Sequence, residues 1–396
     1  MTMNKWKPIF IALYTGQFFS LLSSAAVQFS MIWWLTDTTG SPLILAIAGI
    51  AGFLPQALIG PLAGTLIDRY SRKLMMIAAD MTVALGSLLL FITMLYQEPG
   101  IGLIIVVLVI RSLATAFHMP AMQATIPLLV PEEHLTKASG WGQMVGSITN
   151  IAGPALGMSI LAASSLEWVL LIDVFGALIA STIVLFIKIP KLSKQVEHSG
   201  TSLLAEMKEG YHAIVSHPKV WRLAILIMVV SILYIPVGTY FPLMVRNHFD
   251  QGVLQAGMVE IVFAIGLIVG ASVIGIFGDR FSKVRLMAGG MLIMGVALFI
   301  SGILPASLFY VFVVMSLLIG LSGPIFSAPF SALIQSEIEP HLLGRVFSFI
   351  GSMSLLAAPI GLGIAGVFIE FTNVAMLFMA AGVLIVVNAL ITWRLK

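Results

Sequence analysis

The 396-residue sequence contains no cysteine and very little charge. The absence of cysteine excludes disulfide bonds and thiolate metal sites. Only 9% of the residues are Asp, Glu, Lys or Arg, whereas 59% are hydrophobic. Soluble globular proteins carry about 25% charged residues. This imbalance predicts an integral membrane protein.

Motifs of several enzyme classes are also missing. No G-x-x-x-x-G-K-[ST] sequence occurs, so a P-loop nucleotide site is not expected. The sequence has neither a G-x-S-x-G nucleophile elbow nor an H-E-x-x-H zinc pair, and its seven histidines are scattered. We therefore expect a protein that is not an enzyme, with no catalytic residue, no metal site and no cofactor.

Long apolar runs make up most of what is present. A helix needs about 20 predominantly apolar residues to cross the hydrocarbon core, and charged residues, Pro and Gly divide the chain into twelve such segments. The strands of a membrane barrel would alternate apolar and polar residues, and runs such as 101–110 do not. We predict transmembrane helices over residues 8–36, 41–67, 74–96, 101–129, 135–162, 166–188, 219–245, 252–277, 284–304, 306–335, 342–369 and 373–394.

The basic residues indicate how these helices are oriented. If the N-terminus is cytoplasmic, every Lys and Arg lies in a cytoplasmic segment except Arg111, inside a span, and Arg246, outside. This distribution follows the positive-inside rule. We expect both termini in the cytoplasm, the first span retained as a helix rather than cleaved as a signal peptide, and no nucleic-acid partner.

A polar segment divides the chain into two sets of six spans. We predict an N-terminal six-helix bundle over 1–189, a cytoplasmic linker over 190–218 and a C-terminal six-helix bundle over 219–396. Within the linker, Leu203, Leu204, Met207 and Tyr211 recur at helical spacing. They predict a short amphipathic helix at the membrane surface.

Two short loops repeat one pattern across the two halves. Residues 64–73 read GTLIDRYSRK and residues 275–285 read GIFGDRFSKVR. Duplicated six-helix halves are typical of transporters whose halves rock about a central site. The repeated positions are Gly64, Asp68, Arg69, Arg72 and Lys73 in the first copy and Gly275, Asp279, Arg280 and Lys283 in the second.

The aspartates of this motif suggest a latch between the halves. An aspartate at the end of one span can accept from the unpaired N–H groups at the start of another helix. We expect Asp68 to engage the start of span 11 near Arg345, and Asp279 the start of span 5 near Lys137. The alternative is that the basic residues of the motif only set the membrane topology.

With these residues in view, the chain resembles the major facilitator superfamily of transporters over nearly its full length. Residues 64–73 match the superfamily's loop signature, with Ser71 where Gly is usual, and Arg111 matches its intramembrane arginine. Gly153, Pro154 and Gly157 partly match a signature of drug and proton antiporters, although Thr149 replaces a glycine. The pieces GQFFSLLSSAAVQ, RSLATAFHMPA, LLVPEEHLTKASG and LGRVFSFIGS resemble the macrolide-efflux branch.

The resemblance implies alternating access by two rocking bundles in a bacterial cytoplasmic membrane. In spans 5 and 11 a Pro-Gly pattern repeats, and we expect Gly153, Pro154, Gly157 and Pro359 to act as hinge residues. A central cavity would be lined from spans 1, 4, 7 and 10. The candidates for substrate binding are Gln17, Gln28, Phe117, Asn150, Tyr234 and Phe326.

Ionisable residues inside spans are costly and usually functional, at about 2.5–3.5 kcal/mol for a mid-helix arginine. Arg111 stays protonated, so the carboxylates are the proton-carrier candidates. We rank Glu260 first, as the acid inside a span of the second half, and Asp173 second. Asp80 is near enough to the loop motif to pair with Arg69, Arg72 or Arg111. His118 is either a switch or a hydrogen-bonded residue at a helix kink.

The sequence thus predicts a proton-coupled exporter of amphiphilic, macrolide-like drugs that works as a monomer surrounded by membrane lipid. Other transport functions stay open, namely export of an endogenous metabolite, siderophore or lipid, and import. From a different class, a lipid scramblase or a membrane sensor remains possible.

Overall fold

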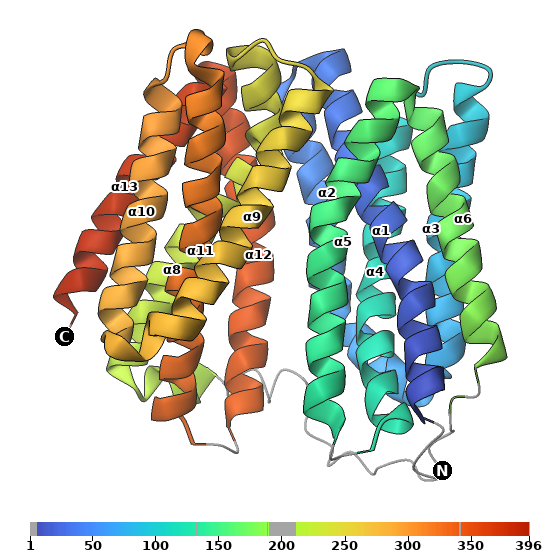
Figure 1. Cartoon of the computed structure of the whole chain (residues 1–396), viewed down its shortest axis with the longest axis horizontal. Coiled ribbons are helices and arrows are strands. Elements are labelled where there is room, and N and C mark those ends of the chain that lie inside the picture. The colour runs from blue at the N-terminus through green and yellow to red at the C-terminus, as the bar shows by residue number, and fades with distance from the viewer. Residues whose placement is uncertain (1–5, 132–133, 188, 190–210, 340–341, 396) are drawn as a thin grey trace. The chain divides into compact units, whose positions relative to one another are not determined.

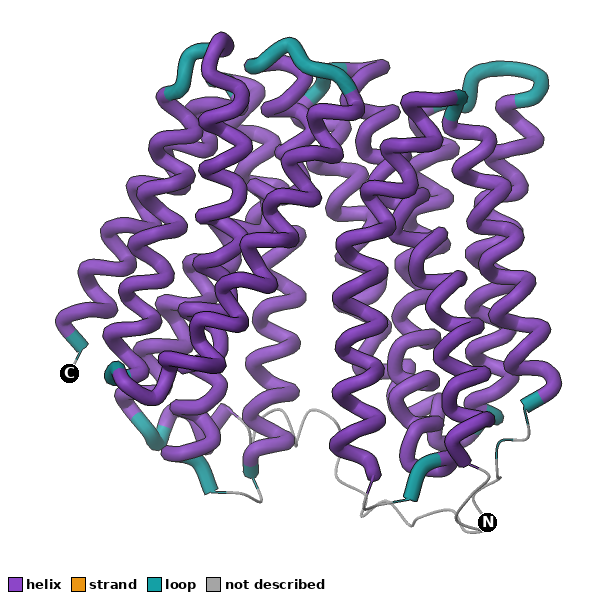
Figure 2. The backbone as a smooth tube through the Cα atoms, viewed as in Figure 1, coloured by secondary structure: helices purple, strands orange, loops and turns teal. Residues whose placement is uncertain are grey.

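The computed structural model describes residues 6–131, 134–187, 189, 211–339 and 342–395. Within these helices it leaves out the side chains of residues 61–62, 64–69, 136–137, 139–140, 143, 279, 344–345, 348 and 352. The described residues form helices joined by short turns, with no strand among them (Figure 2). Twelve of these helices are long and apolar enough to span a membrane. The prediction of an all-α integral membrane protein is confirmed.

The helices follow the charged and Pro/Gly breaks of the sequence closely, and Figure 1 labels them. They are α1 (Trp6–Thr39), α2 (Pro42–Arg69), α3 (Arg72–Met94), α4 (Ile101–Leu129), α5 (Leu135–Ala163), α6 (Leu166–Phe186), α8 (Pro218–Leu243), α9 (Val253–Phe277), α10 (Lys283–Ile303), α11 (Phe309–Glu337), α12 (Leu343–Phe371) and α13 (Val374–Arg394). Short 3-10 turns cover η3 (Gly278–Arg280) and η4 (Ala306–Leu308), and α8 runs into a π-helical turn, η2 (Met244–His248).

The described residues divide into two compact units. The first contains residues 1–35 and 51–198, and the second contains residues 36–50 and 199–396. The boundary near residue 198 falls in the predicted linker, whose expected amphipathic helix lies outside the described residues apart from Tyr211. The turn between α1 and α2 therefore belongs to the second unit, although it lies early in the sequence.

In the first unit, α3 packs on α4 and on α6, and α1 approaches α5 and α6 through glycines. A Cβ built on Gly153 would lie 2.4 Å from the Cβ of Ala25, and one built on Gly176 would lie 2.3 Å from Oγ of Ser23. Small residues allow such close approach where lipid supplies no hydrophobic drive for helix association. These contacts fix the face that α1 turns toward its neighbours.

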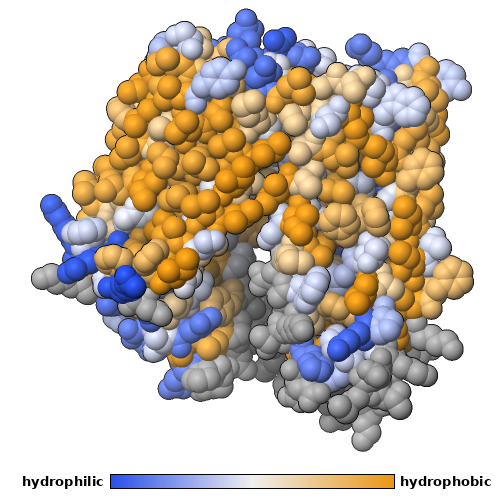
Figure 3. All heavy atoms as spheres, in the orientation of Figure 1, coloured by the Kyte–Doolittle hydropathy of each residue, from blue (hydrophilic) through white to orange (hydrophobic). Residues whose placement is uncertain are grey.

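In the second unit, α10 packs on α13 and α11, α9 packs on α11, and α12 packs on α8. The aromatic rings of Phe241, Phe249, Phe309, Phe312 and Phe378 meet at centroid distances of 4.9–6.4 Å. On the face shown in Figure 3, apolar residues cover the middle of the helices and hydrophilic residues gather toward the helix ends. This pattern fits helices with lipid around their middle turns.

Candidate functional site

The first unit encloses an ion pair between Arg111 of α4 and Asp173 of α6. The guanidinium also donates to Oγ of Ser87 at 3.0 Å and to the carbonyl oxygen of Ser24 at 3.2 Å. Asp173 is fully buried, and it accepts from Ser87 at 2.7 Å, Ser24 at 3.0 Å and Ser23 at 3.2 Å. We call these five residues the Arg111 cluster. Its charges cancel, and each carboxylate oxygen has at least two donors.

A second polar contact lies one heptad away on both α3 and α4. Asp80 is seven residues before Ser87, and His118 is seven residues after Arg111. Nε2 of His118 lies 3.3 Å from Oδ1 of Asp80, within ion-pair distance but without hydrogen-bond alignment. The same oxygen accepts from Oγ of Ser20 at 3.0 Å. We call Asp80 and His118 the Asp80 pair.

The expectation that Asp80 pairs with Arg111 is wrong. The guanidinium of Arg111 is held by Asp173 instead, because Asp173 lies level with Arg111 while Asp80 lies two helical turns away along α3. The side chain of Arg69 is outside the described residues, and Asp80 reaches His118 and Ser20.

Glu260 stands apart from these groups, on α9 of the second unit. It is partly buried, and its carboxyl group lies within electrostatic range of the Tyr234 hydroxyl on α8. No hydrogen bond or ion pair joins Glu260 to another described residue.

The basic residues of the repeated loops cap helix ends. The ammonium of Lys73 donates to the carbonyl oxygens of Leu185 at 2.5 Å and Ile187 at 2.9 Å, at the C-terminal end of α6. Lys283 donates to the carbonyl oxygen of Ala332 and to Ser336, near the end of α11. Both contacts place a cation at the negative end of a helix dipole. Arg280 lies over the ring of Phe277, at 5.1 Å from its centroid.

The predicted latches fall on side chains outside the described residues. They involve Asp68 with Arg345, and Asp279 with Lys137, and Gly64 also lies in this part. Arg72 is partly buried, and Gly275 is exposed with open space around a built Cβ. The latches stay predictions.

Two of the predicted hinge residues are packing contacts of α5. A Cβ built on Gly157 would lie 2.6 Å from the carbonyl oxygen of Ala26, so the close approach to α1 depends on glycine at this position. Pro154 and Pro359 lie inside α5 and α12 and are partly buried. A proline inside a helix removes one backbone hydrogen bond and favours a bend.

The substrate-binding candidates differ in burial. Gln17 is fully buried, Phe326 is buried, and Asn150 is exposed. Both amide atoms of Gln17 have no hydrogen-bond partner among the described residues. Gln28, Phe117 and Tyr234 are partly buried. Of these, Gln17 has the largest unmet need for a polar partner.

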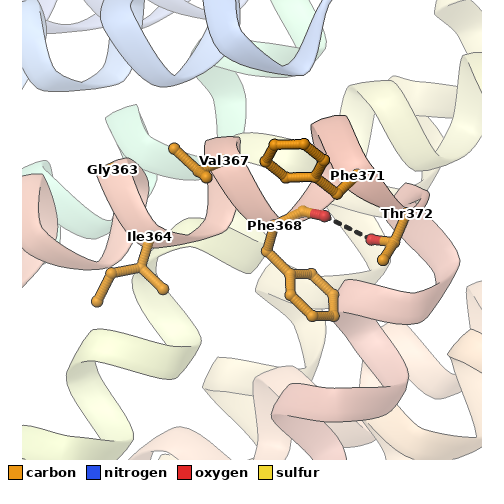
Figure 4. A pocket seen from close by; sticks show the side chains of 6 residues that line it. All are labelled: Gly363, Ile364, Val367, Phe368, Phe371 and Thr372. Atoms are coloured by element: carbon orange, nitrogen blue, oxygen red, sulfur yellow. Dashed lines mark hydrogen bonds between the residues drawn. The ribbon is translucent and has the colours of Figure 1, made fainter.

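Two cavities open on the second unit. A groove of about 700 Å³ follows one side of α12, along Gly363, Ile364, Val367, Phe368, Phe371 and Thr372 (Figure 4). Its one hydroxyl, on Thr372, donates to the carbonyl oxygen of Phe368 at 2.6 Å. A pocket of about 220 Å³ adjoins it at Thr372 and includes Asn247 and His248. Neither cavity includes a predicted substrate-binding residue.

Comparison with known proteins shows the family. The family model of the Major Facilitator Superfamily matches residues 13–259 and 223–396. The chain belongs to the major facilitator superfamily. It is therefore a multi-pass membrane transporter and not an enzyme.

Within the superfamily, the chain is similar to curated efflux proteins. It is 39% identical over 388 residues to macrolide efflux protein A of Streptococcus pyogenes, covering 98% of this chain and 96% of that protein. It is 40% identical over 323 residues to macrolide efflux protein A of Enterococcus faecalis, covering 82% of this chain and 100% of that one. The predicted membership of a macrolide-efflux-like branch is confirmed.

Solved structures of superfamily transporters share the fold. A bacterial homologue of the human lysosomal transporter Spinster, in an inward-facing and unoccupied conformation, aligns with a TM-score of 0.76 at 14% identity, covering 100% of this chain and 98% of that one. A bacterial homologue of the iron transporter ferroportin aligns with a TM-score of 0.73 at 15% identity, covering 98% and 99%.

Sequence reasoning missed four serines of this transporter that contact the buried acids, namely Ser20, Ser23, Ser24 and Ser87. Ser20, Ser23 and Ser24 follow the i, i+3, i+4 spacing of one helix face. Ser87 is one heptad from Asp80. Both spacings are visible in the sequence: the first places three hydroxyls on one face of α1, and the second places Ser87 on the face of α3 that carries Asp80. Buried Asn388 of α13, which donates to the carbonyl oxygen of Leu226 at 3.0 Å, was also missed.

Proposed function

We propose that the protein is a secondary active exporter of bulky amphiphilic drugs of the macrolide class. The observation that carries this proposal is the 39% identity to a macrolide efflux protein over 98% of the chain. The substrate-binding candidates are amides and aromatic residues rather than charged groups, which supports a substrate that is amphiphilic rather than highly charged.

Proton influx drives export in this proposal. The sequence contains no P-loop, so ATP is not the expected energy source. Glu260 remains the first candidate for the proton carrier, supported by its partial burial and by the absence of any cation paired with it among the described residues. Asp173 is a weaker candidate, because protonating it would leave the buried Arg111 without its counter-charge.

The two bundles rock about a central site, and the substrate-binding candidates line the cavity in this proposal. The latches of Asp68 with Arg345 and of Asp279 with Lys137 would close the cytoplasmic side when the protein opens outward. One chain contains both bundles, so a monomer suffices. The basic residues support a bacterial cytoplasmic membrane with both termini inside the cell.

A substrate panel in a pump-deficient bacterial host tests this function. Cells that express the protein should tolerate more erythromycin than vector controls and accumulate less of it, and a protonophore should remove the difference. If another bulky amphiphile is exported while erythromycin is not, the substrate class is wrong. If the protonophore has no effect, proton coupling is wrong.

A further inference from the structure

Asp80 and His118 form a buried pair that differs chemically from Arg111 and Asp173. Asp80 is 4% exposed and His118 is 7% exposed. Arg111 keeps its proton, so its pair is neutral while Asp173 is ionised. Aspartate and histidine both exchange protons. The Asp80 pair is therefore neutral when it holds one proton and negative when it holds none.

The burial of the pair makes any net charge on it costly. An uncompensated charge inside a protein is costly. Without the proton, a carboxylate would be buried with no counter-charge, and with a second proton an imidazolium would be. A pair that holds one proton avoids both of these uncompensated buried charges.

The atoms around Asp80 leave room for that proton. Oδ1 of Asp80 accepts from Ser20 and faces His118, while Oδ2 has no partner among the described residues. Gln17 is one helical turn before Ser20 on α1 and is fully buried with both amide atoms unpaired. A proton on Oδ2 of Asp80 would turn this unpaired acceptor into a donor.

Among the side chains that the structure describes, no other charged group forms an ion pair with Asp80 or His118; the side chain of Arg69 lies outside them. On α4 and α6, Arg111 and Asp173 neutralise each other. Arg72 and Lys73 lie in the first turn of α3, and the ammonium of Lys73 is held by the end of α6. Between Lys7 and Asp37, α1 contributes only Tyr14 as a titratable residue, and its hydroxyl lies against Gly142 of α5.

One turn of α1 connects the pair to the Arg111 cluster. Ser20 donates to Asp80, and the hydroxyl of Ser23 lies within donating distance of two acceptors, the carbonyl oxygen of Ser20 at 3.0 Å and Asp173 at 3.2 Å, for its single hydrogen. A change of protonation at Asp80 changes the acceptor of Ser20.

We propose that Asp80 and His118 together bind one transported proton in the first unit, with Ser20 as a positioning residue. The inference rests on the proposed proton-driven export and adds a second site to Glu260 in the second unit. Transfer makes and breaks only O–H and N–H bonds. The proton binds Oδ2 of Asp80 or a ring nitrogen of His118 and is later released on the other side of the membrane.

Purified protein in liposomes tests the proposal in two modes. Uphill uptake of erythromycin into an acidic lumen needs proton exchange, whereas exchange of labelled for unlabelled erythromycin at equal pH does not. Protein-free liposomes correct for passive trapping of the basic amine. Asp80→Asn and His118→Gln should lose uphill uptake to the protein-free level and keep exchange. Ser301→Ala is the matched control, because its buried hydroxyl bonds only to Ala297 of its own helix.

Each outcome decides the proposal. If uphill uptake persists in Asp80→Asn and His118→Gln, the proposal that the Asp80 pair binds a transported proton is wrong, and the proposed function stands. Loss of both modes in a variant that unfolds at the wild-type temperature also overturns the proposal for the Asp80 pair, because the residue then serves substrate passage. Wild-type uptake that ignores the pH gradient overturns proton-driven export, and this inference with it.

A third variant covers the case in which both substitutions prevent folding. Ser20→Ala removes the hydroxyl that donates to Oδ1 of Asp80. The pH profile of uphill uptake should shift, while exchange at equal pH continues. A pH profile identical to that of the wild type overturns the proposal.

Discussion

The hydroxyl of Tyr240, on α8, donates a hydrogen bond to the carbonyl oxygen of Pro42, the first residue of α2, at 3.0 Å. Tyr240 is fully buried. Nearby, Nε of Arg246 lies 2.7 Å from Oδ1 of Asp37, and both side chains are about half exposed. The start of α2 is thus held in the second unit by one buried hydrogen bond and one exposed ion pair.

We expect the buried hydrogen bond to stabilise the protein more than the exposed ion pair. Tyr240→Phe should lower the free energy of unfolding by about 0.5–1.5 kcal/mol, the usual net contribution of a hydrogen bond. Asp37→Asn should cost about 0–1 kcal/mol, because water screens the pair. Thermal unfolding of purified protein measures both, and a larger loss in Asp37→Asn would contradict the assignment.

Glycine at position 320 is required by the packing of α11 on α9. A Cβ built there would lie 2.0 Å from the carbonyl oxygen of Phe263. Gly320→Ala should destabilise the second unit by about 1–3 kcal/mol, the cost of overpacking. Gly289→Ala on α10 is the control, since a built Cβ meets nothing within 4 Å, and it should be neutral or gain up to about 1 kcal/mol of helix propensity. Equal unfolding temperatures for both variants would refute the close contact.

Removing one member of the Arg111 cluster should cost more than removing both charges. Arg111→Gln leaves Asp173 buried without a counter-charge, at about 3–5 kcal/mol. The double variant Arg111→Gln with Asp173→Asn should recover part of that loss. Unfolding temperature and yield in detergent provide the comparison, and a double variant less stable than Arg111→Gln alone would argue against the pairing.

Glu260→Gln should separate coupling from binding. The amide keeps the size of the side chain but cannot carry a proton, so gradient-driven export should be lost while binding of erythromycin is largely retained. Binding is measured by quenching of tryptophan fluorescence and export in liposomes. Glu370→Gln, an exposed residue near the end of α12, should behave as the wild type. If Glu260→Gln exports at the wild-type rate, Glu260 is not the proton carrier.

Much of the fold was predictable because membrane helices depend on local composition. The prediction for α4, 101–129, agrees with the structure at both ends, since the polar turn before Ile101 and Pro131 limit the run. The π-helical turn at Met244–His248 was not predictable. Its hydrogen bond from Phe249 N to Met244 O spans five residues, and no residue type specifies that pattern.

The ionisable residues of the Arg111 cluster and the Asp80 pair were predictable from the sequence. Which of them pair with each other was not. Arg111, Asp173, Asp80 and His118 are conspicuous inside apolar runs, because such residues are expensive there. Arg111 and Asp173 are 62 positions apart, and their pairing depends on the depth of each residue along packed helices. Asp173 lies at the depth of Arg111, whereas Asp80 lies two helical turns away, so a difference of two turns in depth decides which acid pairs with Arg111. Composition does not fix that depth.

Uphill transport in liposomes tests the central claim most directly. Wild-type protein should accumulate erythromycin in an acidic lumen above the protein-free level, and collapse of the pH gradient by nigericin should release the excess. Accumulation that is unaffected by nigericin, or no accumulation beyond passive trapping, would contradict proton-coupled export by this transporter.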